Sequence, residues 1–151
     1  MAAKNRDIDS FDRNILRILG TDGRITLTDL AARVGLSTTP CQQRVRRLEK
    51  DGYILGYRAV LDLPRMGLAQ IAFVQVNLSD TRETSLQDFR NAVAGISEIE
   101  QCHMIAGGFD YLIKVRTRDI ESFRKVLGEK ISALPFVAHT STFMVMETVR
   151  D

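Results

Sequence analysis

The sequence has few of the residues that carry metal or redox chemistry. Its 151 residues include only two cysteines, Cys41 and Cys102, two histidines, His103 and His139, and no tryptophan. The cysteines can form at most one disulfide and neither lies in a CxxC pair, while the histidines are far apart without a further ligand at a zinc spacing. We therefore expect no metal site, no cofactor and no framework of disulfides.

Long uninterrupted apolar runs are also missing. No segment has the length and the flanks of a signal peptide or of a membrane span. The hydrophobic content of 44% is that of an ordinary globular chain, long enough for one medium domain or two small ones. The sequence thus predicts a soluble, cytoplasmic protein that does not associate with membranes.

A strong excess of one charge is absent as well, because 21 basic residues are set against 19 acidic ones. The balance changes along the chain: residues 1–62 hold 11 basic and 8 acidic residues, and residues 63–151 hold 10 basic and 11 acidic ones. This basic excess in the first part is modest. Nucleic-acid binding would therefore depend on where the basic residues cluster and not on the total charge.

Two short helices are predicted in the first third of the chain. Over residues 11–19, apolar side chains recur on one broad helical face, and Gly20 ends the segment. A second helix opens at Thr26, with Asp29 three residues later in the position of a capping box. Gly35 can adopt a positive φ at the end of this helix, so a tight turn is expected to follow.

A third helix is predicted over residues 38–51. Ser37 is its expected cap, and Pro40 falls in the first turn, where a missing N–H costs little. At 100° per residue, one stripe of this helix is apolar and consists of Cys41, Val45 and Leu48. The Cys41 thiol is therefore expected to be buried and inert, and the short turn between the second and third helices predicts a helix-turn-helix arrangement.

The other side of the third helix, with its flanks, is polar and basic. Its candidate DNA-binding residues are Ser37, Thr38, Thr39, Gln42, Gln43, Arg46, Arg47 and Lys50. Glutamine can pair bidentately with adenine and arginine with guanine, while threonine, arginine and lysine can contact phosphates. A solvated charged face is the alternative interpretation, but a proline-stiffened helix at helix-turn-helix spacing favours a DNA-reading surface.

Beyond the third helix the pattern changes from helical to extended. Residues 53–66, rich in aromatic and β-branched residues and punctuated by Gly56 and Pro64, predict a strand-containing linker or a small hairpin. Strand, helix, strand, strand, helix and strand patterns then follow over 71–79, 83–95, 98–107, 110–118, 119–134 and 137–149. This βαββαβ order predicts a ferredoxin-like domain over residues 67–151, after a helix-turn-helix domain over residues 1–52.

The two helices of the second domain are expected to cover one face of a four-stranded antiparallel sheet. Their predicted buried residues are Leu86, Phe89, Val93 and Ile96 in the first helix, and Ile120, Phe123, Leu127, Ile131 and Leu134 in the second. The other face, bearing Ile71, Phe73 and Met144, would stay open. An open apolar face favours pairing with a second copy, so we expect a dimer.

Two other functions can be weighed against DNA binding. A small enzyme would use Cys102 or His103, but neighbours on a strand point to opposite faces and cannot act together as nucleophile and base. An RNA-binding use of the βαββαβ unit needs exposed aromatic residues on the central strands, and "YLIKVRTR" lacks the aromatic pair. We therefore expect no catalytic residues.

The chain closely resembles the Lrp/AsnC family of transcription regulators, also called the leucine-responsive and asparagine-operon or feast/famine regulators. The resemblance lies in "DRNILRIL", "DGRITLTDLAARVGLSTTPCQQRVRRLEKDGYILGYRAVLD" and "AGGFDYLIKVRTRDIESFRKVLGEKISALPFV". It implies an α+β chain with an N-terminal winged helix-turn-helix domain and a C-terminal ferredoxin-like (RAM-type) domain. It also implies a nucleoid-associated regulator of amino-acid metabolism that binds double-stranded DNA at a roughly palindromic operator.

The resemblance further implies homodimers that assemble into higher oligomers such as octamers, with an effector, usually a free amino acid, in clefts between neighbouring dimers. By position, the effector-binding residues are Met104, Ile105, Gly107, Gly108, Asp110, Ile120, Thr140 and Thr142. Asp110 would accept bonds from the α-ammonium, and the backbone of Gly107 and Gly108 would receive the α-carboxylate. A hairpin turn in which Asp110 bonds the local backbone is the alternative interpretation. Gly108 stands where close relatives of the leucine-responsive type carry an acidic residue, so the identity of the effector is not carried over.

Overall fold

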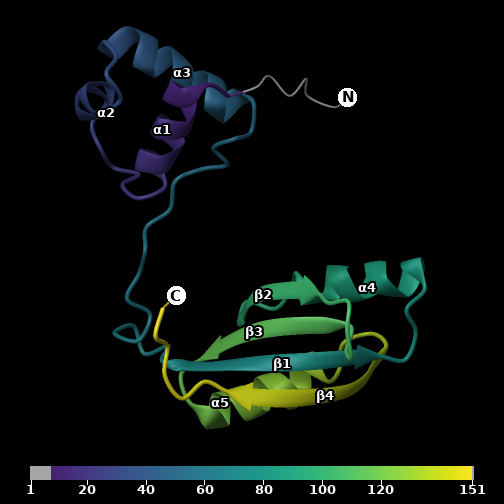
Figure 1. Ribbon diagram of the computed structural model, residues 1–151. Coiled ribbons are helices and arrows are strands. Elements are labelled where there is room, and N and C mark those ends of the chain that lie inside the picture. The colour runs from purple at the N-terminus through teal and green to yellow at the C-terminus, as the bar shows by residue number, and fades with distance from the viewer. Residues whose placement is uncertain (1–7, 151) are drawn as a thin grey trace. The chain divides into compact units, whose positions relative to one another are not determined.

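The computed structural model describes residues 8–150 and divides the chain into two compact units, Met1–Val60 and Leu61–Asp151 (Figure 1). The boundary between the units falls inside the predicted linker, residues 53–66. Residues 1–7 and 151, at the ends of the predicted domain ranges, lie outside the described residues.

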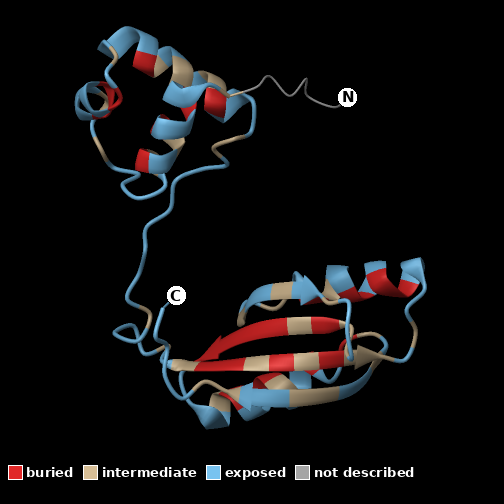
Figure 2. Ribbon diagram, viewed as in Figure 1, coloured by how far each residue is buried: buried red, intermediate tan, exposed pale blue. Residues whose placement is uncertain are grey.

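The described part of the N-terminal unit contains three helices, α1 (Ser10–Leu19), α2 (Leu27–Val34) and α3 (Thr38–Lys50). Their apolar faces meet in one core, whose buried members are Ile15, Ile18, Leu30, Ala31, Val34, Cys41 and Leu48 (Figure 2). Gly35 ends α2 with a φ of 74°, a left-handed conformation that glycine adopts without steric cost. The predicted helix-turn-helix arrangement and the buried position of Cys41 are both confirmed.

The helix caps differ from the prediction in detail. The Asp29 N–H donates to Thr26 Oγ1 at 3.1 Å, but the Asp29 carboxylate accepts the Thr26 hydroxyl at 2.7 Å and not the Thr26 N–H. Only half of the predicted capping box therefore forms. A full capping box links Asp9 and Asp12 at the start of α1. Ser37 is the N-cap residue of α3, but its side chain makes no capping hydrogen bond.

The prediction of a strand or hairpin in the linker is wrong. Between α3 and residue 70 the described chain forms turns and irregular structure and no strand. Tyr53 and Ile54 pack against the helix-turn-helix core, whereas Leu55 and Val60 are 96% and 98% exposed. A strand needs a neighbour that pairs with its backbone groups, and the described part of this chain supplies none here.

The C-terminal unit is an antiparallel sheet with helices on one face. Its elements are β1 (Gln70–Leu78), α4 (Glu83–Val93), β2 (Ile99–Met104), β3 (Tyr111–Thr117), α5 (Ile120–Lys125), the π-helix η1 (Val126–Ile131) and β4 (Val137–Met144). The strand order is β2-β3-β1-β4, and all neighbouring strands run antiparallel. The order and the topology confirm the ferredoxin-like βαββαβ fold.

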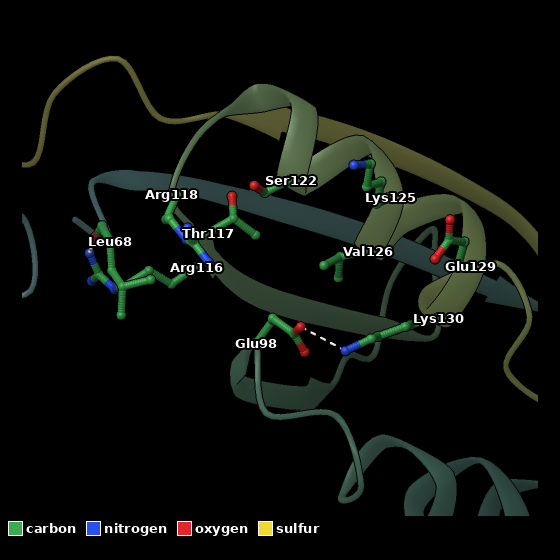
Figure 3. Close-up of a pocket in the computed structure, with 10 residues that line it drawn as sticks. All are labelled: Leu68, Glu98, Arg116, Thr117, Arg118, Ser122, Lys125, Val126, Glu129 and Lys130. Carbon is green, nitrogen blue, oxygen red and sulfur yellow. Dashed lines mark hydrogen bonds and ion pairs between the residues drawn. The ribbon is translucent and has the colours of Figure 1, made fainter. Parts of the chain in front are cut away.

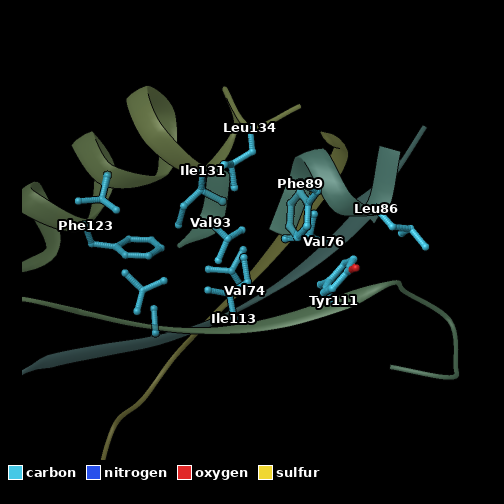
Figure 4. Close-up of a cluster of buried hydrophobic side chains, with 13 residues drawn as sticks. Val74, Val76, Leu86, Phe89, Val93, Tyr111, Ile113, Phe123, Ile131 and Leu134 are labelled. Atoms are coloured by element: carbon cyan, nitrogen blue, oxygen red, sulfur yellow. The ribbon is translucent and has the colours of Figure 1, made fainter. Parts of the chain in front are cut away.

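The core of this unit lies between the helices and one face of β1 and β3 (Figure 4). The sheet contributes Ala72, Val74, Val76, Tyr111, Ile113 and Val115. Leu86, Phe89 and Val93 of α4 are buried against this face, as predicted, and the ring centroids of Phe89 and Tyr111 are 4.5 Å apart. Alternation along the strands thus placed the helix-covered face correctly.

The second helix is not a continuous α-helix, because α5 continues directly into η1. The i→i+5 hydrogen bonds of a π-helix bring residues five apart onto the same side. Val126 and Ile131 are accordingly both buried, with 6% and 0% exposure. Helical spacing does not predict the burial of Val126. It predicts that Ile120 is buried, but this first residue of α5 is 60% exposed.

The sheet face away from the helices carries Ile71 and Phe73, as predicted. Met144 is not on this face, because it pairs with Ala72 and directly opposite residues share a face. Met144 packs against the helix-side core instead. Its neighbour Phe143, opposite Phe73 and 53% exposed, lies on the open face.

The open face also carries charge and is partly bordered by the C-terminal segment. Lys114 and Arg116, opposite Phe73 and Ile71, are buried and both pair with Glu100. The predicted last strand is too long, since β4 ends at Met144. Residues 145–150 continue past the strand, and several of them line, with Ile71 and Phe73, a cavity of about 350 Å³.

Candidate DNA-binding surface and effector-binding loop

One side of α3 presents polar side chains to solvent. Its exposed members are Ser37, Thr38, Thr39, Gln43, Arg46 and Lys50, and Gln42 beside them is half-buried. The opposite side packs into the core through Cys41, Val45 and Leu48. Burial raises the pKa of the Cys41 thiol, which keeps it protonated and unreactive at neutral pH. The helix therefore has one packing side and one free side, as its periodicity predicted.

Arg47 is held differently from the other predicted DNA-binding residues. Its Nη2 lies 2.5 Å from Oδ2 of Asp12, a side chain with 1% exposure. Arg44 Nη1 donates to the other oxygen of Asp12 at 2.9 Å and to Asp9 Oδ2 at 2.6 Å. Two arginines of α3 thus neutralise a buried carboxylate of α1, so Arg47 has a structural role whether or not it also contacts DNA.

Arg44 and Asp12 were not among the predicted functional residues. Asp12 lies three residues before Ile15 and so falls on the buried stripe of α1, and an acid on a buried stripe was the available signal. The hydrogen bonds that Arg44 donates to Asp9 and then to Asp12 raise the pKa of Arg44, while bonds from the Asp12 N–H and from Arg44 lower the pKa of Asp9. Arg44 and Asp9 therefore stay charged across neutral pH.

The loop between β2 and β3 brings together five of the eight predicted effector-binding residues. These are Met104, at the end of β2, and Ile105, Gly107, Gly108 and Asp110. Three hydrogen bonds fasten the loop to the end of β1: the Asp110 N–H donates to Val76 O at 3.0 Å, the Leu78 N–H to Asp110 Oδ2 at 2.7 Å, and Asn77 Nδ2 to Gly108 O at 3.3 Å. The loop is therefore fixed on the sheet.

The carboxylate of Asp110 is only partly used by these bonds. Its Oδ2 accepts the Leu78 N–H, which is backbone bonding of the kind expected from a turn. Among the described residues no hydrogen bond reaches Oδ1, and the side chain is half-buried. One oxygen of Asp110 thus positions the loop, and the other can accept a bond from a ligand.

The remaining predicted effector-binding residues lie at different ends of the sheet. Thr140 is opposite Val76, which in turn is opposite Tyr111, so Thr140 lies at the loop end. Thr142 is two residues further along β4. Ile120 begins α5, after β3 has ended at Thr117, and therefore lies at the other end. Within one chain the structure does not bring Ile120 to the loop.

A cavity of about 350 Å³ lies at that other end, between α5–η1 and the ends of β2 and β3 (Figure 3). Its lining residues are Leu68, Glu98, Arg116, Thr117, Arg118, Ser122, Lys125, Val126, Glu129 and Lys130. Lys130 Nζ donates to Glu98 Oε1 at 2.7 Å, and this bond lowers the pKa of Glu98. None of the eight predicted effector-binding residues lines this cavity.

The side chains considered for catalysis or metal binding are not brought together. Cys102 packs towards the helix-side core, while its neighbour His103 is exposed. In the part of the chain that the structure describes, no group of three or more histidine, cysteine, aspartate or glutamate side chains could hold a metal ion. Within residues 8–150 no helix is long and apolar enough to cross a membrane.

Two family models match the chain, one for each unit. A model of winged helix-turn-helix DNA-binding domains matches residues 8–54, and a model of the Lrp/AsnC ligand-binding domain matches residues 71–151. These matches agree with the two folds described above.

Individual relatives match over almost the full length. The chain is 57% identical over 148 residues to a proline dehydrogenase transcriptional activator of Rhizobium radiobacter, covering 98% of this chain and 95% of the relative. It is 45% identical over 146 residues to the leucine-responsive regulatory protein of Escherichia coli (strain K12), covering 97% and 89%. A solved transcriptional regulator of Neisseria meningitidis in complex with L-methionine has a TM-score of 0.90 at 27% identity, covering 96% and 94%. The chain belongs to the Lrp/AsnC family of DNA-binding transcription regulators.

Proposed function

We propose that α3 is the recognition helix of a sequence-specific regulator of amino-acid metabolism, and that its exposed side enters the major groove of an operator. The observation that supports this most strongly is the division of α3 into a packed side and a free polar side. Gln43 and Arg46 can pair with base edges, whereas Thr39 and Lys50 suit phosphates. Paired helices of a dimer would read a roughly palindromic site with half-sites about 34–36 Å apart.

The effector of this regulator is a free amino acid bound at the β2–β3 loop. The N. meningitidis relative was solved with L-methionine, which supports this ligand class. Asp110 Oδ1 would accept the α-ammonium, and the exposed backbone of Gly107 and Gly108 would receive the α-carboxylate. Ile120, at the other end of the sheet, would have to come from a neighbouring chain.

The working form is a homodimer that assembles further into higher oligomers, such as the octamers that the family resemblance implies. Phe73 and Phe143 lie opposite each other on the open sheet face and provide an apolar surface for a second copy. Leu55 and Val60 of the linker are almost fully exposed, and a second copy would also remove them from water. No catalytic role and no cofactor are part of the proposal.

The effector proposal can be tested by a thermal-shift screen of the twenty amino acids. A ligand at about 100 times its Kd stabilises the folded form by about 2.7 kcal/mol, which raises the Tm by several degrees. The informative variant is Asp110→Asn, because its side-chain oxygen still accepts the Leu78 N–H while the negative charge is lost. We expect a clearly smaller shift in this variant, whereas Asp88→Asn, a change at an exposed acid of α4, retains the full shift.

Analytical ultracentrifugation should then show whether the effective amino acid alters assembly, since an effector acts only through different affinities for two states. A full response in Asp110→Asn would show that the carboxylate is not the anchor. A screen in which none of the twenty amino acids shifts the Tm would count against an amino-acid effector altogether.

A further inference from the structure

Another cavity of the C-terminal unit lies between α4 and the β2–β3 hairpin, and it has a volume of about 290 Å³. Its lining residues are Arg90, Val93, Ala94, Cys102, Met104 and Tyr111. Sites for small molecules usually measure about 300–1,000 Å³ and are mostly apolar with a few polar groups. This cavity is just below the lower limit of that range and has the same kind of lining.

The hydroxyl of Tyr111 is a buried polar group without a hydrogen-bond partner among the described residues. Tyr111 is 2% exposed, and its ring packs beside Phe89 (Figure 4). Burial raises the pKa of this hydroxyl, and the nearby Arg90 charge offsets the effect only in part, so the group remains a donor at neutral pH. Buried hydroxyls are normally paired, because an unpaired one destabilises the fold. Its place in the cavity wall therefore indicates an acceptor from outside the chain.

Arg90 is the charged residue of the cavity lining, and its ion pair with Glu83 can be exchanged. Arg90 Nη2 lies 2.5 Å from Glu83 Oε1, and the two side chains are 40% and 80% exposed. Exposed ion pairs contribute little to stability, so a ligand can replace either partner at low cost. The guanidinium then suits a carboxylate, and the freed Glu83 suits an ammonium group.

We propose that this cavity binds a small monocarboxylate with an apolar side chain, of the class of hydrophobic α-amino acids and their 2-oxo analogues. Arg90 binds the carboxylate, the Tyr111 hydroxyl donates a hydrogen bond to it, and Val93 and Met104 enclose the apolar side chain. The site goes beyond the proposed effector loop because it is complete within one chain and does not use Asp110. The two share only Met104.

Cys102 offers a direct test, because its thiol lines the cavity while Cys41 is fully buried and serves as an internal reference. The full-length chain would be alkylated at mildly alkaline pH with and without L-leucine, L-methionine, 4-methyl-2-oxopentanoate or glycine. The rate at each cysteine would be read by mass spectrometry. We expect the first two ligands to slow alkylation of Cys102 and glycine to have no effect. Slowing by the oxo acid as well would assign the ligand class to monocarboxylates in general, and slowing by the amino acids alone would add a role for Glu83.

Calorimetric titration of variants locates the contacts. Arg90→Gln should weaken binding about tenfold, and Tyr111→Phe severalfold, by loss of one charged and one neutral hydrogen bond. Tyr111→Phe should fold at least as well as the unaltered chain, because it removes an unpaired hydroxyl. Arg82→Gln, whose arginine pairs with Asp80 outside the cavity, is the matched control and should bind normally.

Measurements in the Asp110→Asn background separate this site from the effector loop. Protection of Cys102 that persists there supports the cavity site even if the loop proposal fails. Ligand binding that disappears there, with Cys102 alkylated at the same rate throughout, would overturn the cavity site and leave the loop proposal standing. An unchanged Kd in both Arg90→Gln and Tyr111→Phe would also overturn it.

Discussion

The carboxylate of Asp12 shows how one residue can fix the orientation of the proposed recognition helix α3. A buried charge is strongly unfavourable unless it is paired and hydrogen-bonded. Asp12 meets this requirement through Arg44 and Arg47. These two arginines lie 32 and 35 positions away in sequence and are half-buried residues of α3. The pairing ties the rotation of α3 to α1, so it determines which side of α3 is exposed to solvent.

The substitution Asp12→Asn should therefore destabilise the N-terminal unit by about 2–3 kcal/mol, because two charge-assisted hydrogen bonds of a buried group are weakened. Urea unfolding followed by circular dichroism would measure this change. Asp51→Asn, at an exposed acid just after α3, is the control and should stay within about 0.5 kcal/mol of the unaltered chain. Equal midpoints for both variants would show that the buried pairing does not support α3.

Substitutions on the free side of α3 should divide into two classes. Arg46→Ala and Gln43→Ala should lower operator affinity by about 1–3 kcal/mol and relax sequence preference, because these side chains can reach base edges. Lys50→Ala should weaken binding about equally on all sequences and reduce the salt dependence. Competition titrations with operator and scrambled duplexes would separate the classes, and a uniform loss in all three variants would refute the division.

At the scale of elements, periodicity in the sequence predicted most of the helices and strands of the fold. Spacing of i, i+4 and i+7 identified the buried side of α3, and alternation identified the strands and their order. The face of Met144 could not be predicted, because it depends on the register of β4 against β1, which no local pattern determines. The π-helix η1 could not be predicted either, because it replaces the α-helical period within a continuous helix.

The candidate site was predictable to a similar degree. The exposed residues of α3 and the loop around Asp110 followed from periodicity and from the family resemblance. The pairing of Arg47 with Asp12 and the bond from the Leu78 N–H to Asp110 did not, because both join residues more than 30 positions apart. The cavity at Tyr111 arises from the packing of α4 on the hairpin, which a one-dimensional pattern does not contain.

The turn between α2 and α3 depends on the left-handed backbone conformation of Gly35. Gly35 has a φ of 74°, where an L side chain is strained even though the space around the position is open. Gly35→Ala should lower the free energy of unfolding by about 1–2 kcal/mol. Gly35→Asn should lower it less, because asparagine tolerates the left-handed region better. Urea midpoints that ranked the two variants in the opposite order would argue against a strained turn.

At the scale of the whole molecule, two apolar surfaces point to association of copies of this chain. One is the open sheet face around Phe73 and Phe143, and the other is the linker segment around Leu55 and Val60. A large contiguous apolar patch on a surface commonly marks a protein–protein interaction site. Assembly would also give paired recognition helices, which a roughly palindromic operator requires.

The substitution Phe143→Asp should convert the dimer to a monomer, because it places an unpaired charge in the middle of the proposed interface. Sedimentation velocity at micromolar concentration would detect the change. Ile120→Asp alters a similarly exposed apolar residue that begins α5 and does not lie on the sheet. The proposed effector site puts Ile120 at a contact between dimers, so this variant should leave the dimer itself intact even where higher assembly changes. A dimer that persists in Phe143→Asp would exclude this face as the interface.

If α3 delivers sequence-specific DNA binding, the chain should distinguish its own promoter DNA from other duplexes, which fluorescence anisotropy measures. Affinity for the promoter should exceed that for a random duplex by about 1,000-fold or more at physiological salt. It should also fall linearly with salt on a log–log scale, because phosphate contacts release counterions. Equal affinity for the two duplexes, or affinity that does not change with salt, would show that α3 does not bind DNA in this way.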